Sequence, residues 1–288
     1  MLVLSMVLGF ILLASIKELV RFINGLVKLK STTTPNISFL WNLAFISVIQ
    51  ALFGTNTVFI STLTGHNMRG YHCQLDAVIN SSCAFGMIFQ LMNICVVQIN
   101  PNFHGDGYLK KIAPSLCIVW GVSWAVLPLF GIGKWVPHCK GVYCCLDFTS
   151  DNFYDRTYFV LLTVFGFALP VCLMVTLSFL PTKKERKNTA LNNETYSYQS
   201  HGLINIFPIV FVFTILWLPT GVVATLRMLG FNEYISDYID LFDILCGFCS
   251  YVTLCHMLSN QLQHFPVKKG KNMKLANGDL NANDLKFE

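Results

Sequence analysis

Four of the eleven cysteines lie in short polar gaps between long apolar runs, where a thiol can take part in redox chemistry. They are Cys73, Cys139 and the adjacent Cys144 and Cys145 of the segment VYCCLDF (142–148). Cysteines in an oxidising compartment form disulfides, and Cys73 could bridge either member of the pair. The remaining cysteines lie inside apolar runs, where cysteine behaves as a small hydrophobe. We therefore expect a disulfide rather than a metal or redox site.

Acidic side chains inside apolar runs are the second chemical feature. Asp240 and Asp243 are three residues apart, so they share one face of a helix. Ionisable groups within a membrane usually serve a function, and this pair could contact a cationic ligand or Arg227. In the first run, Glu18 could pair with Arg21. The sequence contains no metal-ligand spacing, phosphate-binding loop or nucleophile triad, so we do not expect an enzyme.

Composition indicates the medium around these residues. Hydrophobic residues make up 54% of the 288 and charged residues 12%, about half the charged fraction of a soluble domain. Seven apolar segments are long enough to cross a bilayer, and they must do so as helices that satisfy their own backbone. They cover about residues 2–27, 38–63, 73–99, 112–133, 157–180, 203–229 and 235–258. The sequence predicts an all-α, seven-transmembrane helix bundle over residues 1–265, with a disordered tail at 266–288.

The distribution of lysine and arginine predicts the orientation in the membrane. More than twice as many basic residues flank the spans on one side as on the other, and that side is expected to be cytoplasmic. The protein would cross the plasma membrane several times, with its N-terminus outside and its C-terminus inside. The net charge of +5 is modest and spread over loops, which does not favour nucleic acid as a partner. A cytoplasmic basic run could contact membrane lipid; it holds Lys183, Lys184, Arg186 and Lys187.

This topology places Cys73 and the cysteine pair outside the membrane. A bridge between Cys73 and Cys144 or Cys145 would hold the loop between spans four and five over the helix ends. The sequence therefore predicts a lid above a cavity between the helices.

Further residues carry a resemblance to a receptor family. The seven spans, the cysteine that opens span three and the cysteine in the second outer loop resemble the rhodopsin-like (class A) G-protein-coupled receptors. The segment FTILWLP (213–219) is similar to a sixth-helix motif of that family, Pro170 to its fifth-helix proline and Trp120 to its fourth-helix tryptophan. The resemblance implies that Phe213 and Trp217 form the floor of a ligand cavity.

Within that family, the segments WAVLPLFGIG (124–133) and CCLDF (144–148) resemble opsins of the retinochrome, peropsin and retinal G-protein-coupled-receptor-like branch. Aligning the lid loop on its aspartate makes Cys144 the partner of Cys73, with Cys145 as the alternative. Asp76 falls where visual opsins keep the carboxylate that balances a protonated Schiff base. The resemblance implies a ligand cavity with contributions from Asp76, Phe213, Trp217, Asp243 and Cys246.

The chain departs from opsins where they bind retinal. Opsins hold retinal through a seventh-helix lysine, and residues 234–258 contain no lysine. Cys246 or a near neighbour occupies the corresponding place, and a thiol does not form a stable imine. We expect no covalent cofactor, although a retinoid could bind non-covalently.

The usual signalling residues of the family are also replaced. Val97, Gln98 and Ile99 stand where the family has Asp-Arg-Tyr, so Gln98 takes the place of the arginine that faces the G protein. The resemblance also implies that a heterotrimeric G protein could contact the basic run that holds Lys183, Lys184, Arg186 and Lys187. Ser47 replaces the second-helix aspartate, and His256 replaces the seventh-helix tyrosine. These polar groups normally re-pair between inactive and active states, so signalling would need other switches.

The sequence thus predicts an opsin-like receptor that binds a small apolar ligand and signals through atypical switches. Two alternatives stay open. One is a carrier or isomerase-like protein that holds a retinoid without a covalent bond. The other is a non-signalling decoy receptor that acts by pairing with other receptors.

Overall fold

The computed structural model describes residues 2–29, 37–99, 108–138, 141–147, 150–180, 206–231 and 237–263. Seven helices in this part are long and apolar enough to cross a membrane, which confirms the predicted all-α, seven-helix bundle. The tail at 266–288 lies outside the described residues. The α-helices are α1 (Leu2–Leu29), α2 (Ile37–Ile49), α3 (Asn56–Thr64), α4 (Gly70–Ile99), α5 (Tyr108–Val126), α6 (Phe153–Leu161), α7 (Leu169–Ser178), α9 (Ile206–Met228) and α10 (Asp237–Gln263).

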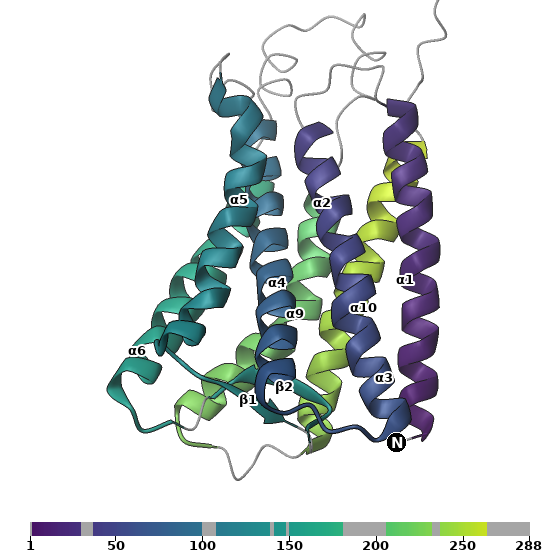
Figure 1. Ribbon diagram of the computed structural model, residues 1–288. Coiled ribbons are helices and arrows are strands. Elements are labelled where there is room, and N and C mark those ends of the chain that lie inside the picture. Colours follow the sequence, from purple (N-terminus) through teal and green to yellow (C-terminus); the bar gives the residue numbers. More distant parts are fainter. Residues whose placement is uncertain are drawn as a thin grey trace, which may run out of the picture.

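The bundle is arranged around α4 (Figure 1). This helix packs against α5, α2 and α7, whereas α1 packs along α10. Fully buried side chains such as Phe22 of α1, Leu43 of α2 and Met87 of α4 fill the space between the helices. The close packing of α1 on α10 brings the first and last spans side by side (Figure 1).

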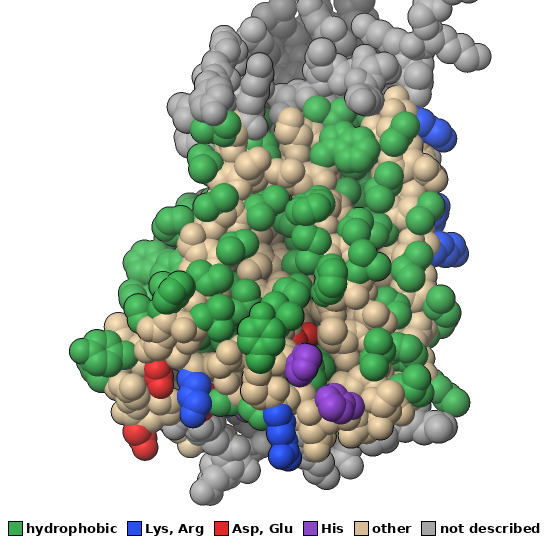
Figure 2. Space-filling model, in the orientation of Figure 1, with side chains coloured by type: hydrophobic (Ala, Val, Ile, Leu, Met, Phe, Trp, Pro, Cys, Tyr) green, Lys and Arg blue, Asp and Glu red, His purple; other side chains and the backbone are tan. Residues whose placement is uncertain are grey.

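The outer surface of the bundle is apolar, as expected for helices in lipid. Figure 2 shows hydrophobic side chains over the flank of the bundle and a group of charged and histidine side chains near one end. Phe10 and Phe130 are 74% and 78% exposed, which would be unfavourable in water but not in hydrocarbon. The same composition that predicted membrane spans therefore explains why the buried and exposed faces are both apolar.

Two of the spans contain a π-helical segment. The second span combines α2, η1 (Gln50–Thr55) and α3, and the fifth combines α6, η4 (Leu162–Ala168) and α7. In η1, a Cβ atom on Gly54 would collide with the side-chain amides of Gln50 and Asn80. Glycine at this position therefore lets the second span approach α4 closely. Because π segments insert an extra residue into a helix, they change which side chains face the cavity.

A short hairpin crosses one end of the bundle (Figure 1). Strand β1 (Trp135–His138) pairs antiparallel with β2 (Tyr143–Leu146), with Trp135 opposite Leu146. The 3₁₀ helix η2 (Leu127–Phe130) leads from α5 toward this hairpin. We call β1 and β2 the lid, the end that it covers the lid end, and the opposite end the far end.

Hydrogen bonds beside the lid strands join the lid region to α6 and to the loop between α3 and α4. The backbone N–H of Gly133 donates to Asp155 Oδ1 at 3.1 Å. The backbone N–H of Met68 donates to the carbonyl oxygen of Gly141 at 2.7 Å. Gly133 has a φ of +90°, and a Cβ there would collide with the ring of Tyr158. The lid is therefore held in place by α6 on one side and by the loop between α3 and α4 on the other.

Candidate functional site

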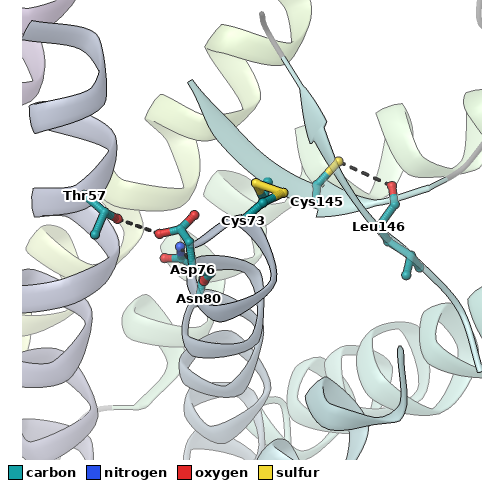
Figure 3. The surroundings of a disulfide bond; sticks show 7 residues. Thr57, Cys73, Asp76, Asn80, Cys145 and Leu146 are labelled. Atoms are coloured by element: carbon teal, nitrogen blue, oxygen red, sulfur yellow. Dashed lines mark hydrogen bonds between the residues drawn. A yellow bond between two sulfur atoms is a disulfide. The ribbon is translucent and has the colours of Figure 1, made fainter. Parts of the chain in front are cut away.

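A disulfide joins the lid to the bundle. Cys73, in the first turn of α4, bonds to Cys144 of β2, and their Cα atoms are 5.3 Å apart. Cys145 is reduced, and its Sγ donates to the carbonyl oxygen of Leu146 at 3.4 Å (Figure 3). Neighbouring side chains of a strand point to opposite faces, so only one member of the pair can reach Cys73. The bridge to Cys144 confirms the predicted lid disulfide.

Asp76 connects α4 to α3 instead of facing the cavity. Its side chain is buried, and Thr57 Oγ1 donates to its Oδ1 at 2.5 Å (Figure 3). One turn below, Asn80 Nδ2 donates to the backbone oxygen of Asp76 at 3.0 Å. The prediction that Asp76 lines the cavity is not met, because the carboxylate turns toward Thr57. Sequence position alone could not identify this partner on another helix.

The candidate site is a cavity of about 260 Å³ beneath the lid. Its wall is mostly apolar and is formed by residues of the lid and of five spans, which meet at this end of the bundle. A volume near the lower end of the range for small-molecule sites favours a ligand of modest size. The lining residues are Gln50, Val58, Asn80, Ser81, Ala84, Phe85, Ile88, Trp135, Tyr143, Cys144, Cys145, Leu146, Phe159, Leu162, Thr163, Phe167, Trp217, Thr220, Gly221, Ala224, Asp243, Ile244, Gly247, Phe248 and Tyr251.

Trp217 of α9 lines the deep part of the cavity and joins α9 to α10. Its indole Nε1 donates to Ser250 Oγ at 3.0 Å, and Ser250 donates in turn to the backbone oxygen of Gly247. The predicted floor residue Phe213 is 2% exposed and is not among the lining residues. Its ring instead packs against Trp217, with the ring centres 5.8 Å apart. Phe213 therefore supports the floor from below.

Asp243 places a carboxylate in this apolar wall. Thr220 Oγ1 of α9 donates to Asp243 Oδ1 at 2.5 Å, a second link between α9 and α10. The predicted lining residue Cys246 is not part of the wall, whereas its neighbour Gly247 is. One residue along an α-helix rotates the side chain by about 100°, so a shift of one position explains this error. A Cβ on Gly247 would meet no atom within 4 Å, because it would point into the cavity.

Arg227 joins the lid end of α9 to the lid. It is buried, and its Nη1 lies 3.2 Å from His138 Nδ1 of β1. The side chain of Asp240, the other acid predicted to matter in this region, lies outside the described part of the chain. Arg227 therefore ties α9 to the hairpin that covers the cavity, and it is not among the lining residues.

A group of charged and polar side chains links α1 to α10 in the far half of the bundle. Glu18 pairs with Arg21 at 3.1 Å, as the sequence indicated, and its other carboxylate oxygen lies 3.1 Å from His256 Nδ1. His256 Nε2 lies 2.9 Å from Asn260 Nδ2. Sequence reasoning noted His256 only as a replacement for tyrosine and missed its contact with Glu18. We call the contact between Glu18 and His256 the α1–α10 clasp.

The predicted G-protein-facing residues are only partly described. Gln98 lies near the far end of α4 and is 7% exposed. The basic residues Lys183, Lys184, Arg186 and Lys187 lie outside the described ranges. Ser47, at the position of the family's aspartate, donates to the backbone oxygen of Leu43 in its own helix. Ser47 thus satisfies its hydroxyl locally and brings no charge to the core.

Comparison with known proteins finds one family that matches most of the chain. The sequence profile of the 7 transmembrane receptor (rhodopsin family) matches residues 23–257. In structure, squid rhodopsin superposes with a TM-score of 0.74 and 20% identity, over 88% of this chain and 79% of that one. The structural likeness concerns the fold.

The curated relatives include opsins from several animals. Melanopsin of Podarcis siculus is 23% identical over 144 residues, which cover 45% of this chain and 30% of that protein. Rhodopsin of Enteroctopus dofleini is 25% identical over 244 residues, which cover 75% of this chain and 54% of that protein. The matched regions thus span less than two thirds of these relatives.

Proposed function

We propose, from the premise that this chain belongs to the rhodopsin family of seven-transmembrane receptors, that it senses a small, mostly apolar ligand held non-covalently beneath the lid. The chain is a multi-pass membrane protein whose sequence is similar to opsins. The observation that carries the proposal is the apolar cavity under a disulfide-held lid, with Trp217 at its deep end. A largely preformed apolar pocket with a few polar groups is the usual form of a small-molecule site.

The residues of the seventh span support the proposal of non-covalent binding. Residues 234–258 contain no lysine, so no amine from this segment can form an imine with an aldehyde. The position that projects into the cavity is Gly247. A retinoid remains a candidate ligand, but it would be held by packing and hydrogen bonds alone.

The ligand would act on the contact between α9 and α10. Two hydrogen bonds join these helices at the cavity, from Trp217 to Ser250 and from Thr220 to Asp243. A ligand that binds one arrangement of these contacts better than another shifts the population of the two. We propose that the resulting change at the cavity is transmitted along α10 to its far half. There the α1–α10 clasp would take the place of the family's missing signalling residues.

A heterotrimeric G protein is the proposed partner at the far end. Gln98 and the basic run at Lys183, Lys184, Arg186 and Lys187 would take part in that contact. We also propose that the lid end faces outside the cell at the plasma membrane. An oxidising exterior would keep the Cys73–Cys144 bond formed.

Ligand extraction tests the proposal directly. The full chain would be expressed in cells supplied with retinoids and mixed lipids, purified mildly and denatured, and the released molecules identified by mass spectrometry. A Gly247→Phe variant is the matched control, because its ring would occupy the cavity without meeting a neighbouring atom at Cβ. We expect one stoichiometric apolar compound from the wild type and little from the variant.

Two other results would contradict the ligand site or the receptor function. Equal recovery from the wild type and from Gly247→Phe would mean that the compound is bulk lipid, and the cavity would not be a ligand site. A recovered retinoid together with no effect on G-protein activation would favour the carrier over the receptor.

A further inference from the structure

We propose that the far half of α1 binds the head group of an anionic phospholipid through basic side chains on its outer face. These side chains are Lys17, Arg21 and Lys28, with the amide of Asn24 between them. We call the four residues the α1 stripe. The inference does not depend on the ligand cavity, because the stripe lies on the outer surface of the bundle.

The residues of the α1 stripe share one face of the helix because their spacing matches its turns. Successive members are four, three and four residues apart, and these spacings place side chains one above another on an α-helix. Lys17, Asn24 and Lys28 are exposed, and Arg21 is partly exposed. Figure 2 shows basic side chains along the edge of the molecule that α1 forms, toward the far end. The stripe therefore faces the surroundings of the bundle and not a neighbouring helix.

The positive charge of the α1 stripe exceeds the negative charge beside it. Within the described part of the chain, Lys17 and Lys28 form no hydrogen bond or ion pair. Arg21 pairs with Glu18, and both contacts use the same nitrogen, Nη1, at 3.1 Å. A guanidinium has five N–H donors, so Arg21 can donate to a second acceptor while Glu18 holds it in place. One carboxylate thus lies beside three basic side chains, and an anionic partner would balance the remainder.

The other half of the same helix face favours a lipid as that partner. Toward the lid end the face carries Val3, Met6 and Phe10, all of them exposed. The face therefore changes from apolar to basic along its length, and a phospholipid has the same order from its chains to its head group. A partner helix would have to place acidic side chains within the membrane, which is unfavourable.

The length of α1 brings the stripe within reach of lipid head groups. A hydrocarbon core takes about 20 residues of helix, whereas α1 has 28. With the uncharged residues 2–16 in the core, the helix leaves the hydrocarbon near Arg21. Lys17 lies about 6 Å deeper, and a lysine side chain spans this distance by extending toward the surface. In the proposed orientation the far end meets the cytoplasmic leaflet, which carries the anionic lipids.

Photo-crosslinking from the stripe would test the inference. The full chain with Asn24→benzoylphenylalanine would be reconstituted into liposomes that hold equal amounts of phosphatidylserine and phosphatidylcholine with identical acyl chains. After irradiation, mass spectrometry would identify the lipids attached to the protein. We expect phosphatidylserine to exceed phosphatidylcholine by at least about threefold, since each nearby basic residue strengthens binding of an anionic lipid. Phe10→benzoylphenylalanine reports the apolar half of the face and should capture the two lipids equally.

Single variants assign the excess of phosphatidylserine to the stripe. Lys17→Gln, added to Asn24→benzoylphenylalanine, should lower the excess by at least about twofold. Lys17→Arg keeps the positive charge and should keep the excess. The matched control is Lys134→Gln, which removes an exposed lysine near the lid and should leave the excess unchanged.

Three results would overturn the inference. The first is equal capture of the two lipids from Asn24→benzoylphenylalanine. The second is an excess that Lys17→Gln and Lys134→Gln reduce equally, because the net charge of the protein and not the stripe would then attract the lipid. The third is crosslinking chiefly to a second copy of the chain, or to another protein when the label is irradiated in cell membranes. None of these results bears on ligand binding beneath the lid.

Discussion

At the scale of single residues, the two cysteines of the lid have different roles although they are neighbours. Cys144 forms the bond to Cys73, and the reduced Cys145 lies half-buried in the cavity wall. The resemblance to opsins indicated Cys144, and the alternation of side chains along β2 supplies the physical reason.

This difference leads to a prediction about stability. Cys144→Ser should lower the free energy of unfolding by about 2–5 kcal/mol, the usual effect of losing a native disulfide. Cys145→Ser should change it by less than about 0.5 kcal/mol, as for substitutions without a structural role. Thermal unfolding of the purified variants in nanodiscs would measure both. Equal losses for the two variants would contradict the assignment of the bridge.

The other predicted site residues differ in how far the sequence could place them. Trp217 and Asp243 line the cavity, and the sequence identified them by the sixth-helix motif and by a charge within an apolar run. Asp76 could not be placed, because its orientation depends on Thr57 of another span. Gln50 and Trp135 were not identified, since an amide and an indole carry no spacing signal in the sequence.

At the scale of elements, the spans themselves could be predicted but their internal irregularities could not. Long apolar runs must form helices in lipid, so composition was sufficient to find all seven. The π segments η1 and η4 depend on packing against neighbouring helices and have no reliable sequence pattern. The one-residue error at Cys246 is of the same kind, because the rotation of α10 is set by its neighbours.

The π segment η1 allows a matched test of two glycines. Gly54→Ala should destabilise the protein by about 1–3 kcal/mol, the usual effect of overpacking, because its Cβ would collide with the amides of Gln50 and Asn80. Gly247→Ala should be neutral or stabilising, since its Cβ would meet open space and alanine favours helix.

Chemical unfolding in nanodiscs would compare the two glycine variants with the wild type. A loss of stability in Gly247→Ala as large as that in Gly54→Ala would show that both sites are packed. The description of the cavity wall at α10 would then be wrong.

At the scale of the whole molecule, polar contacts connect the helices at several depths within an otherwise apolar bundle. Near the lid end, Asp76 joins α4 to α3 through Thr57. At the cavity, Trp217 joins α9 to α10 through Ser250. In the far half, Glu18 joins α1 to α10. Because α10 takes part in the last two contacts, a movement that begins at the ligand would reach α1 through this helix.

The α1–α10 clasp should therefore have a measurable coupling energy. Glu18→Gln, His256→Phe and the double variant form a cycle that isolates the contact between the two side chains. Glu18 is almost fully buried and His256 is partly exposed, so we expect a coupling of about 0.5–2 kcal/mol, the range for polar contacts within membrane bundles. Chemical unfolding of the four proteins in nanodiscs would measure it.

A variant of Arg21 distinguishes the effect of losing the contact between Glu18 and His256 from the effect of removing a nearby charge. Arg21 pairs with Glu18 within the same helix, so Arg21→Gln removes a charge near the clasp but leaves the contact between α1 and α10. If α10 transmits the state of the cavity, spin labels at the far ends of α1 and α10 should show a broader distance distribution in Glu18→Gln than in Arg21→Gln. Identical distributions in these two variants would mean that the clasp does not hold α10 against α1, and the proposed route from cavity to far end would lose its last step.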